Sequence, residues 1–229
     1  MATILNIETS TAVCSAALAK DGKIIAVQES SLPNVHAEKL TAFIDSLLKE
    51  AALPYSSIDA IAIGTGPGSY TGLRIGTSTA KGLAYSLDKP MIAIPTLKAM
   101  ALATADILKR KDIYYCSLID ARRLEVYCAI YTFEGNEIMP VEAKILDENS
   151  FEDILNNTPI AFAGDGMPKL KKLSAHNSAQ RIWADEIYAS AKNMVTLSEE
   201  AFREKQFADV AYYEPFYLKD FVAGKKTIQ

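Results

Sequence analysis

IGTGPGSYTGLRIG, residues 63–76, is the stretch that decides the fold of this chain. An apolar run, residues 58–63, leads into it, and a segment with helical character begins near Thr71. Glycines and a proline dominate positions 64–68 and predict a tight, unusual turn, since glycine adopts positive φ and proline fixes its own. The turn delivers the chain to a helix N-terminus, where free N–H groups and the helix dipole favour an anion. The simpler interpretation is a structural strand-to-helix connection.

The turn does not match the common phosphate loops. No lysine follows Gly72, so it is not a P-loop, and Ser69 interrupts the G-x-G-x-x-G pattern that Gly64 and Gly66 begin. A rarer family therefore has to account for it.

Composition and charge are those of an ordinary globular protein. The chain has 229 residues, of which 49% are hydrophobic and 23% charged, with a formal net charge of −4. Binding to a nucleic-acid backbone needs clustered Lys and Arg, so a mildly acidic chain is a poor free-standing nucleic-acid binder. The basic group Lys169, Lys171 and Lys172 is typical of a solvated helix face.

Cysteine and histidine usage predicts an intracellular protein without a metal cluster. Cys14, Cys116 and Cys128 form no C-x-x-C pair, and their apolar settings indicate buried free thiols in a reducing compartment. His36 and His176 are far apart and have no Cys neighbours. The N-terminus has no basic region typical of a signal peptide, and no apolar run approaches the roughly 20 residues that span a bilayer. We therefore expect a cytoplasmic location and no membrane partner.

The first half combines strand and helix periodicities. Strands are predicted over 3–7, 13–19 and 23–29, with a hairpin at Asp21-Gly22. A helix over 35–51, with Asn34 as its N-cap, precedes a strand (58–63), a helix (71–87), a strand (91–94) and a helix (96–110). A three-stranded meander followed by strand–helix alternation is the order of a ribonuclease-H-like lobe.

The second half repeats this order in reduced form. Strands are predicted over 113–119, 125–133, 137–146 and 159–163, and helices over 150–156, from Pro168, and over 186–204, before an aromatic tail at 212–221. No linker separates the halves. The sequence therefore predicts an α/β protein of two lobes, residues 1–108 and 109–229, that pack tightly together.

These motifs together resemble the TsaB family, the bacterial dimerisation subunit of the tRNA threonylcarbamoyladenosine machinery. The residues that carry the resemblance are 7–11 (IETST), 36–40 (HAEKL), 66–76 with 80–84 (AKGLA), 120–122 (DAR) with 125–127 (EVY), and 215–218 (PFYL). The resemblance implies the two-lobed actin/Hsp70/sugar-kinase fold, with a reduced second lobe. Glu8 stands where this family more often has Asp, and Lys219 where it usually has Arg, a pair of residues that are not interchangeable.

The resemblance also implies that the chain is not an enzyme. In the catalytic paralogue, TsaD, two metal-binding histidines follow the glycine turn, and here Thr96 and Met100 take their places. Neither is a ligand for a hard divalent ion. Glu8 alone makes a poor Mg²⁺ site, and Ser10 and Ser69 have no neighbouring histidine to activate them.

We expect the remaining function to lie on a surface. Gly72, Gly76 and Ala80 recur at intervals of four on the helix predicted over 71–87, and small residues allow close helix approach. One interpretation packs this stripe on the chain's own sheet; the other places a partner on it. The residues predicted to form the partner interface are Leu40, Phe43, Leu47, Leu73, Gly76, Thr77, Ala80, Lys81 and Ala84.

A second set of residues is predicted to contact a nucleotide or to serve as family-motif contacts. It comprises Glu8, Thr9, Ser10, Gly66, Gly68, Ser69, Arg74, Asp120 and Arg122. For Asp120 and Arg122, with Glu125, a charged hairpin tip is the simpler account.

The predicted function is that of a non-catalytic scaffold for the transferase that forms N6-threonylcarbamoyladenosine at position 37 of tRNA. By the family resemblance, its partners are TsaD and the ATPase TsaE, tRNA is reached only through the complex, and a homodimer forms when the partner is absent. No cofactor of its own is expected, although ATP or ADP can be held at the complex interface. The alternatives are a small ATP-dependent phosphotransferase and a peptidase-M22-like metalloprotease of the same fold.

Overall fold

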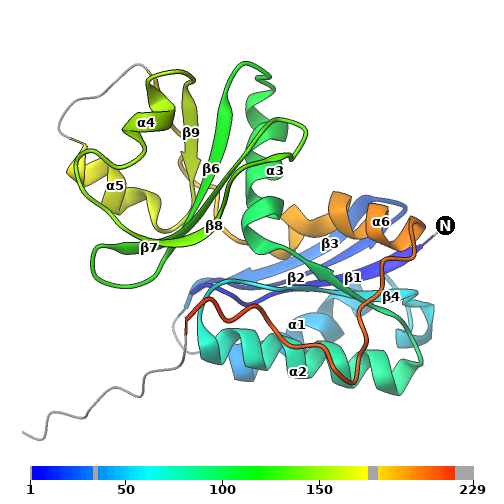
Figure 1. Cartoon of the computed structure of the whole chain (residues 1–229). Helices are drawn as coiled ribbons and strands as arrows, with labels where there is room; N and C mark the ends of the chain where they lie inside the picture. The colour runs from blue at the N-terminus through cyan, green and yellow to red at the C-terminus, as the bar shows by residue number, and fades with distance from the viewer. Residues whose placement is uncertain (1, 33–35, 175–179, 220–229) are drawn as a thin grey trace, which may run out of the picture.

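The computed structural model describes residues 2–32, 36–174 and 180–219 and consists of two lobes, each built on a five-stranded sheet (Figure 1). The strand orders are β3-β2-β1-β4-β5 and β8-β7-β6-β9-β10, which is the same arrangement twice. In each sheet the first three strands form an antiparallel meander and the last two run parallel to the first. The predicted repetition of the first half by the second is confirmed.

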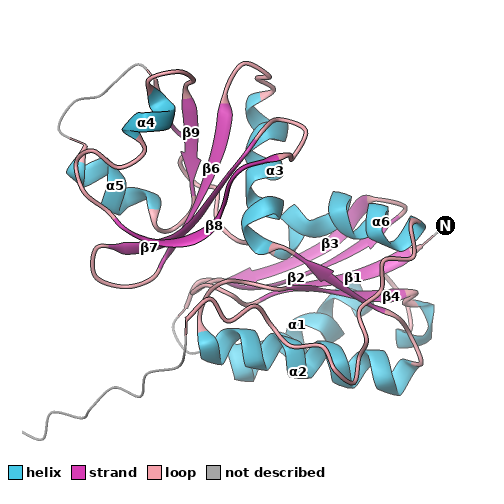
Figure 2. Cartoon of the chain, in the orientation of Figure 1, coloured by secondary structure: helices cyan, strands magenta, loops and turns pink. Residues whose placement is uncertain are grey.

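The first sheet contains the strands β1 (Thr3–Glu8), β2 (Cys14–Lys20), β3 (Lys23–Ser30), β4 (Ala60–Gly64) and β5 (Met91–Ile94). The β2–β3 hairpin turns at Asp21 and Gly22, which have φ of 52° and 71°, as the Asp-Gly pair predicts. The helices α1 (His36–Glu50) and α2 (Tyr70–Leu87) cover one face (Figure 2). A short 3₁₀ turn, η1 (Tyr55–Ser57), connects α1 to β4. The predicted cap Asn34 lies outside the described residues.

The second sheet contains β6 (Tyr114–Asp120), β7 (Glu125–Tyr131), β8 (Glu137–Ile145), β9 (Ile160–Ala163) and β10 (Arg181–Trp183). The helices α4 (Glu152–Leu155) and α5 (Met167–Leu173) lie on one side of it, and both are short, which is how the second lobe is reduced. The helix α3 (Thr96–Leu108) packs on the other face, with Leu97, Met100 and Ala105 in one core cluster with Tyr115.

The C-terminal part returns to the first lobe. A 3₁₀ turn, η2 (Ala191–Met194), and α6 (Val195–Arg203) cover the second face of the first sheet, where Met194 and Ala201 share a core cluster with Ile4 (Figure 2). The two sheets thus exchange helices: α3 comes from the first half and α6 from the second. A lobe boundary at 108/109 stays a prediction. It separates the strands of the two sheets, but α3 and α6 each pack on the sheet of the other half.

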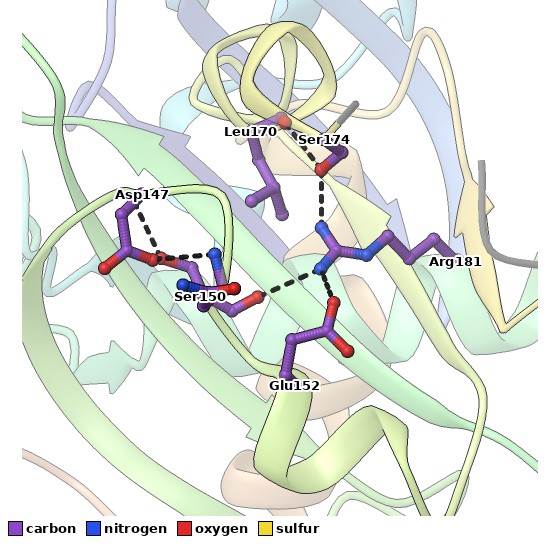
Figure 3. Close-up of polar contacts among 7 residues, drawn as sticks. Asp147, Ser150, Glu152, Leu170, Ser174 and Arg181 are labelled. Atoms are coloured by element: carbon purple, nitrogen blue, oxygen red, sulfur yellow. Dashed lines mark hydrogen bonds and ion pairs between the residues drawn. The ribbon is translucent and has the colours of Figure 1, made fainter. Parts of the chain in front are cut away.

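Two features of the second half differ from the sequence prediction. The helix predicted to begin at 186 is replaced by the 3₁₀ turn η2, which begins at Ala191 after the cap Ser190 accepts the Lys192 N–H, and by α6, which begins at Val195. The strand β10 was not predicted, since it has only three residues and includes a charged one. The Arg181 side chain is 2% exposed and contacts Glu152, Ser174 and the Ser150 carbonyl, so it joins β10 to α4 and α5 (Figure 3).

Beyond α6, residues 206–219 run as an extended segment along the first lobe, orange to red in Figure 1. We call this segment the C-terminal tail. Within the part of the chain that the structure describes, no helix is both long and apolar enough to cross a lipid bilayer.

Candidate functional site

The glycine turn brings the end of β4 and the start of α2 against the turn that follows β1. A Cβ built on Gly68 would lie 2.1 Å from the Ser10 carbonyl oxygen, and one on Gly72 would lie 2.1 Å from the Thr9 carbonyl oxygen. One on Gly76 would lie 2.2 Å from Thr9 Oγ1. Glycine is therefore required at positions 68 and 72, because the backbone of the β1 turn occupies the space of a side chain there, and at position 76 because the Thr9 side chain occupies it.

Ser69 caps α2 and ties the two turns together. Its Oγ accepts the Gly72 N–H at 3.2 Å, and its own N–H donates to the Ser10 carbonyl at 2.6 Å. One of the free N–H groups at the helix N-terminus, that of the third helical residue, is thus satisfied by the chain itself. This arrangement agrees with the simpler interpretation of the stretch, a structural connection.

Glu8 is enclosed between these turns and α3. The residue is 1% exposed, and its Oε1 accepts the N–H groups of Thr9 and Ser10, both at 2.8 Å. Thr96 Oγ1 donates to the other oxygen, Oε2, at 2.8 Å, and itself accepts the Gly66 N–H at 3.0 Å. Burial raises the pKa of the Glu8 carboxyl above its ordinary value, although the donated hydrogen bonds oppose the shift. Both oxygens accept hydrogen bonds from the protein, so Glu8 has a structural role: it connects the turn after β1 to the start of α3.

The tail covers the outer side of the glycine turn. The Phe216 N–H donates to the Thr65 carbonyl at 2.9 Å, and the Tyr217 ring lies 4.9 Å from the Tyr70 ring, centroid to centroid. Arg74 is exposed and lies over the Tyr70 ring, 5.4 Å from its centroid. The predicted contact Arg74 therefore belongs to an aromatic cluster beside the turn.

Asp120 and Arg122 lie on the second sheet, at the tip of the β6–β7 hairpin. Asp120 Oδ1 pairs with Lys169 Nζ at 2.6 Å and accepts the Arg122 N–H at 2.6 Å. Its own N–H donates to Asp165 Oδ1 at 3.0 Å. Asp120 is thus engaged within its own lobe, as a charged hairpin tip would be.

A cavity of about 670 Å³ opens between the lobes. The sequence predicted that the lobes pack tightly, and at this cavity they do not. It is lined by the β1–β2 turn and the end of β3 on one side, and by the β9–α5 and β10–η2 connections on the other. Four of its lining residues are acidic, namely Glu29, Asp165, Asp185 and Glu186, and none is Lys or Arg. Glu29 and Asp185 pair with Lys192 and Lys171, and no lining residue offers a positive charge to the phosphates of a nucleoside triphosphate, so the lining does not fit one.

Comparison with known proteins places the chain in a family. The family model described as "TsaD: tRNA N6-adenosine threonylcarbamoyltransferase" matches residues 30–227. The tRNA threonylcarbamoyladenosine biosynthesis protein TsaB of Escherichia coli is 32% identical, over 97% of this chain and 97% of that protein.

This chain belongs to the TsaB family.

Solved structures agree with this assignment. YeaZ from Pseudomonas aeruginosa has a TM-score of 0.80 and 27% identity, over 95% of this chain and all of that chain. The inorganic polyphosphate/ATP-glucomannokinase from Arthrobacter sp. strain KM has a TM-score of 0.50 at 11% identity, over 90% of this chain and 99% of that chain, which shows the fold alone. The predicted actin-like, sugar-kinase fold is confirmed.

Most residues predicted to form the partner interface of this TsaB-family chain are inside it. Leu40, Leu47, Leu73, Gly76, Thr77, Ala80 and Ala84 are buried, and only Phe43 and Lys81 are partly exposed. The small-residue stripe faces the chain's own sheet, where Gly76 meets Thr9 and Ile63. These buried side chains lie on the inward face of the helices. The sequence does not show which of two small faces turns inward, and their place in a partner interface stays a prediction.

The outward face of α1 and α2 carries different residues. Thr41 on α1 and Ser78 and Gly82 on α2 line a groove of about 220 Å³ between the helices, together with Ile44, Tyr55, Thr79 and Leu83. A Cβ on Gly82 would meet nothing within 4 Å. Ser78 and Gly82 thus form an exposed pair of small residues at a spacing of four. Close approach of another helix was expected at Gly72, Gly76 and Ala80, but this pair is the one that is exposed.

The two positions of the paralogue's histidines are both interior. Thr96 and Met100 are each 1% exposed, and Met100 packs near Gly164 of the other lobe. Among the described residues, no three His, Cys, Asp or Glu side chains form a group that could hold a metal ion. The second histidine of the sequence, His176, lies outside the described residues.

The structure therefore divides the predicted contact residues into two groups. Glu8, Thr9, Ser10, Gly66, Gly68 and Ser69 do come together, whereas Asp120 and Arg122 belong to the other lobe. Sequence reasoning missed Thr96 as the hydrogen-bond donor to Glu8, because the two lie 88 positions apart. It also missed Lys169 as the partner of Asp120, which it had assigned to a solvated face.

Proposed function

We propose that this chain is a non-catalytic scaffold subunit of the assembly that forms N6-threonylcarbamoyladenosine in tRNA, and that it pairs with the catalytic paralogue TsaD. Its similarity to proteins named for this biosynthesis supports the pathway. Acting on tRNA, the assembly would work in the cytoplasm. With its net charge of −4, the chain would reach tRNA only through the complex.

The enclosed Glu8 supports a scaffold rather than an enzyme. A phosphotransferase of this fold would need a carboxylate open to a metal–nucleotide complex, and both oxygens of Glu8 are hydrogen-bonded within the chain. A metalloprotease would need metal ligands where Thr96 and Met100 are buried. ATP or ADP would then be held, if at all, with residues of TsaD or TsaE.

The observation that carries the proposal is the outward face of α1 and α2. Thr41, Ser78 and Gly82 leave a shallow groove between two amphipathic helices, which fits a pair of helices from a partner. Exposed Tyr85, with 86% of its surface free, lies one turn beyond Gly82 and supplies an aromatic anchor. A second copy of the chain would use the same face when TsaD is absent.

The test is size-exclusion chromatography with light scattering on the chain mixed with TsaD from the same source. A peak at the heterodimer mass is expected for the wild type. Gly82→Arg should weaken pairing at least tenfold, since a large side chain there prevents close helix approach, while its Cβ meets no atom of the chain within 4 Å.

Thr196→Arg is the matched control. It adds the same charge at an exposed position of α6, on the opposite face of the same sheet, and should pair as the wild type does. Wild-type pairing by Gly82→Arg, with the fold intact, would overturn the proposed interface. No heterodimer with any variant would overturn the scaffold function.

A further inference from the structure

Two sequence motifs that the proposed function leaves unused meet in the structure. Glu125 begins the EVY motif at the start of β7, and Lys219 follows the PFYL motif of the tail. Lys219 Nζ lies 2.5 and 2.6 Å from the two oxygens of Glu125, 94 positions away. We propose that the tail is a strap that holds the second lobe closed against the first, with the Lys219–Glu125 ion pair as its fastening.

The tail is anchored to the first lobe at several places along its length. The Ala208 N–H donates to the Met91 carbonyl of the edge strand β5 at 2.8 Å, and Lys81 of α2 donates to the Ala211 carbonyl at 3.2 Å. Tyr213 packs against the core beneath α1 and α2, and the Phe216 N–H binds the Thr65 carbonyl. Figure 1 shows this segment running beside α2 toward the second lobe. These contacts fix every part of the tail up to its last few residues.

The described tail is attached to the second lobe by a single ion pair, and its acidic partner, Glu125, is linked to several elements of that lobe. The Glu125 backbone carbonyl accepts a hydrogen bond of 3.0 Å from Lys169 of α5, and Lys169 also pairs with Asp120 at the end of β6. The ion pair with Lys219 therefore connects the tail, through Glu125, to β6, β7 and α5. No other residue of the described tail is recorded in a hydrogen bond or ion pair with the second lobe.

The lobes have room to move when the strap is released. Apart from the tail, the chain crosses between the sheets twice, through α3 and between β10 and η2, and the cavity of about 670 Å³ separates them on the acidic side. The ion pair is partly exposed, with side-chain exposures of 47% for Lys219 and 20% for Glu125, so water can compete with it and it can open. The strap is thus a reversible fastening that adds to the packing of α3 against η2 and the first sheet.

The experiment measures the distance between the lobes in the full-length chain. Spin labels on Ser46→Cys of α1 and Asn156→Cys after α4, both exposed positions, report the distance by pulsed electron resonance. Lys219→Met should broaden and lengthen the distance distribution and speed hydrogen exchange of the tail amides about two- to five-fold, the effect expected of an exposed ion pair.

Three control variants make the test specific. Lys219→Arg, which can bind a carboxylate through two parallel hydrogen bonds, should keep the wild-type distribution. The exchanged pair Glu125→Lys with Lys219→Glu should restore it, and Lys172→Met on exposed α5 should leave it unchanged. A wild-type distribution for Lys219→Met, or no restoration by the exchanged pair, would overturn the proposal. Pairing with TsaD is measured separately, so this result does not depend on the proposed function.

Discussion

Thr96 Oγ1 donates a hydrogen bond of 2.8 Å to Oε2 of Glu8 while it accepts one of 3.0 Å from the Gly66 N–H. One hydroxyl group therefore connects the end of β1, the glycine turn and the first residue of α3. Because all three residues are buried, a missing hydroxyl cannot be replaced easily by water.

The first prediction is that Thr96→Val destabilises the chain by about 2 kcal/mol, because it leaves one oxygen of a buried carboxylate and one N–H without a partner. Chemical denaturation measures the loss. Thr104→Val is the control: its hydroxyl is equally buried in α3 but donates only to the Met100 carbonyl one turn back, so a loss below about 1 kcal/mol is expected. Equal losses for the two variants would contradict the role assigned to Thr96.

The second prediction concerns pH. Burial raises the pKa of Glu8 above its ordinary value of 4.5, so between 4.5 and the raised value the folded state binds more protons than the unfolded state. The free energy of unfolding should therefore fall as pH rises through this range, and this fall should be absent in Glu8→Gln. Urea denaturation of both proteins at pH 5 and pH 8 measures the difference. Parallel pH dependences would show that Glu8 ionises without cost in the fold.

The third prediction compares two glycines of α2. Gly76→Ala should destabilise the chain by about 2 kcal/mol or more, since its Cβ would lie 2.2 Å from Thr9 Oγ1. Gly82→Ala should stabilise it by about 0.5–1 kcal/mol, because alanine is the better helix former and its Cβ meets no atom. Thermal unfolding of the two variants gives both signs. Destabilisation by Gly82→Ala would mean that this face of the helix is not open.

The fourth prediction is that the thiols are inert in the folded chain. Burial raises the pKa of Cys14 to about 11 and that of Cys128 to about 12, and raises the pKa of Cys116 well above its ordinary value. At pH 8 the thiolate is the reactive form, so alkylation should be at least about 100-fold slower than that of an exposed cysteine. Mass spectrometry after iodoacetamide treatment, with and without urea, measures the difference. Rapid labelling without urea would contradict the buried positions.

The local elements could be predicted from the sequence wherever the hydrophobic period was long and its ends carried a signal. The β2–β3 hairpin follows from Asp21-Gly22, and α2 begins within one residue of the position expected from the glycine turn. The start of the last helix could not be placed, because residues 186–189 have a helix-like composition but precede the cap at Ser190.

The site was less predictable because it depends on contacts between distant residues. Glycines at 68, 72 and 76 indicated a close approach, yet the sequence did not show that the approaching group is the chain's own β1 turn. The inward and outward faces of α2 could not be told apart for the same reason: Ala80 and Ser78 are both small, and only the packing on β4 decides that Ala80 faces inward and Ser78 faces solvent. Contacts such as Glu8–Thr96 have no local sequence signal at all.

The exchange of helices between the sheets has a consequence for synthesis on the ribosome. The strands of the first sheet are complete once Ile94 has been made, but the helix that covers their second face extends to Arg203. A nascent chain must therefore carry this sheet with an incompletely covered apolar face from the synthesis of Ile94 until that of Arg203, a state that is prone to aggregate. The first sheet can be fully covered only after α6 has left the exit tunnel, so chaperone binding during translation should concentrate on the Ile4–Ala62–Ile92 face.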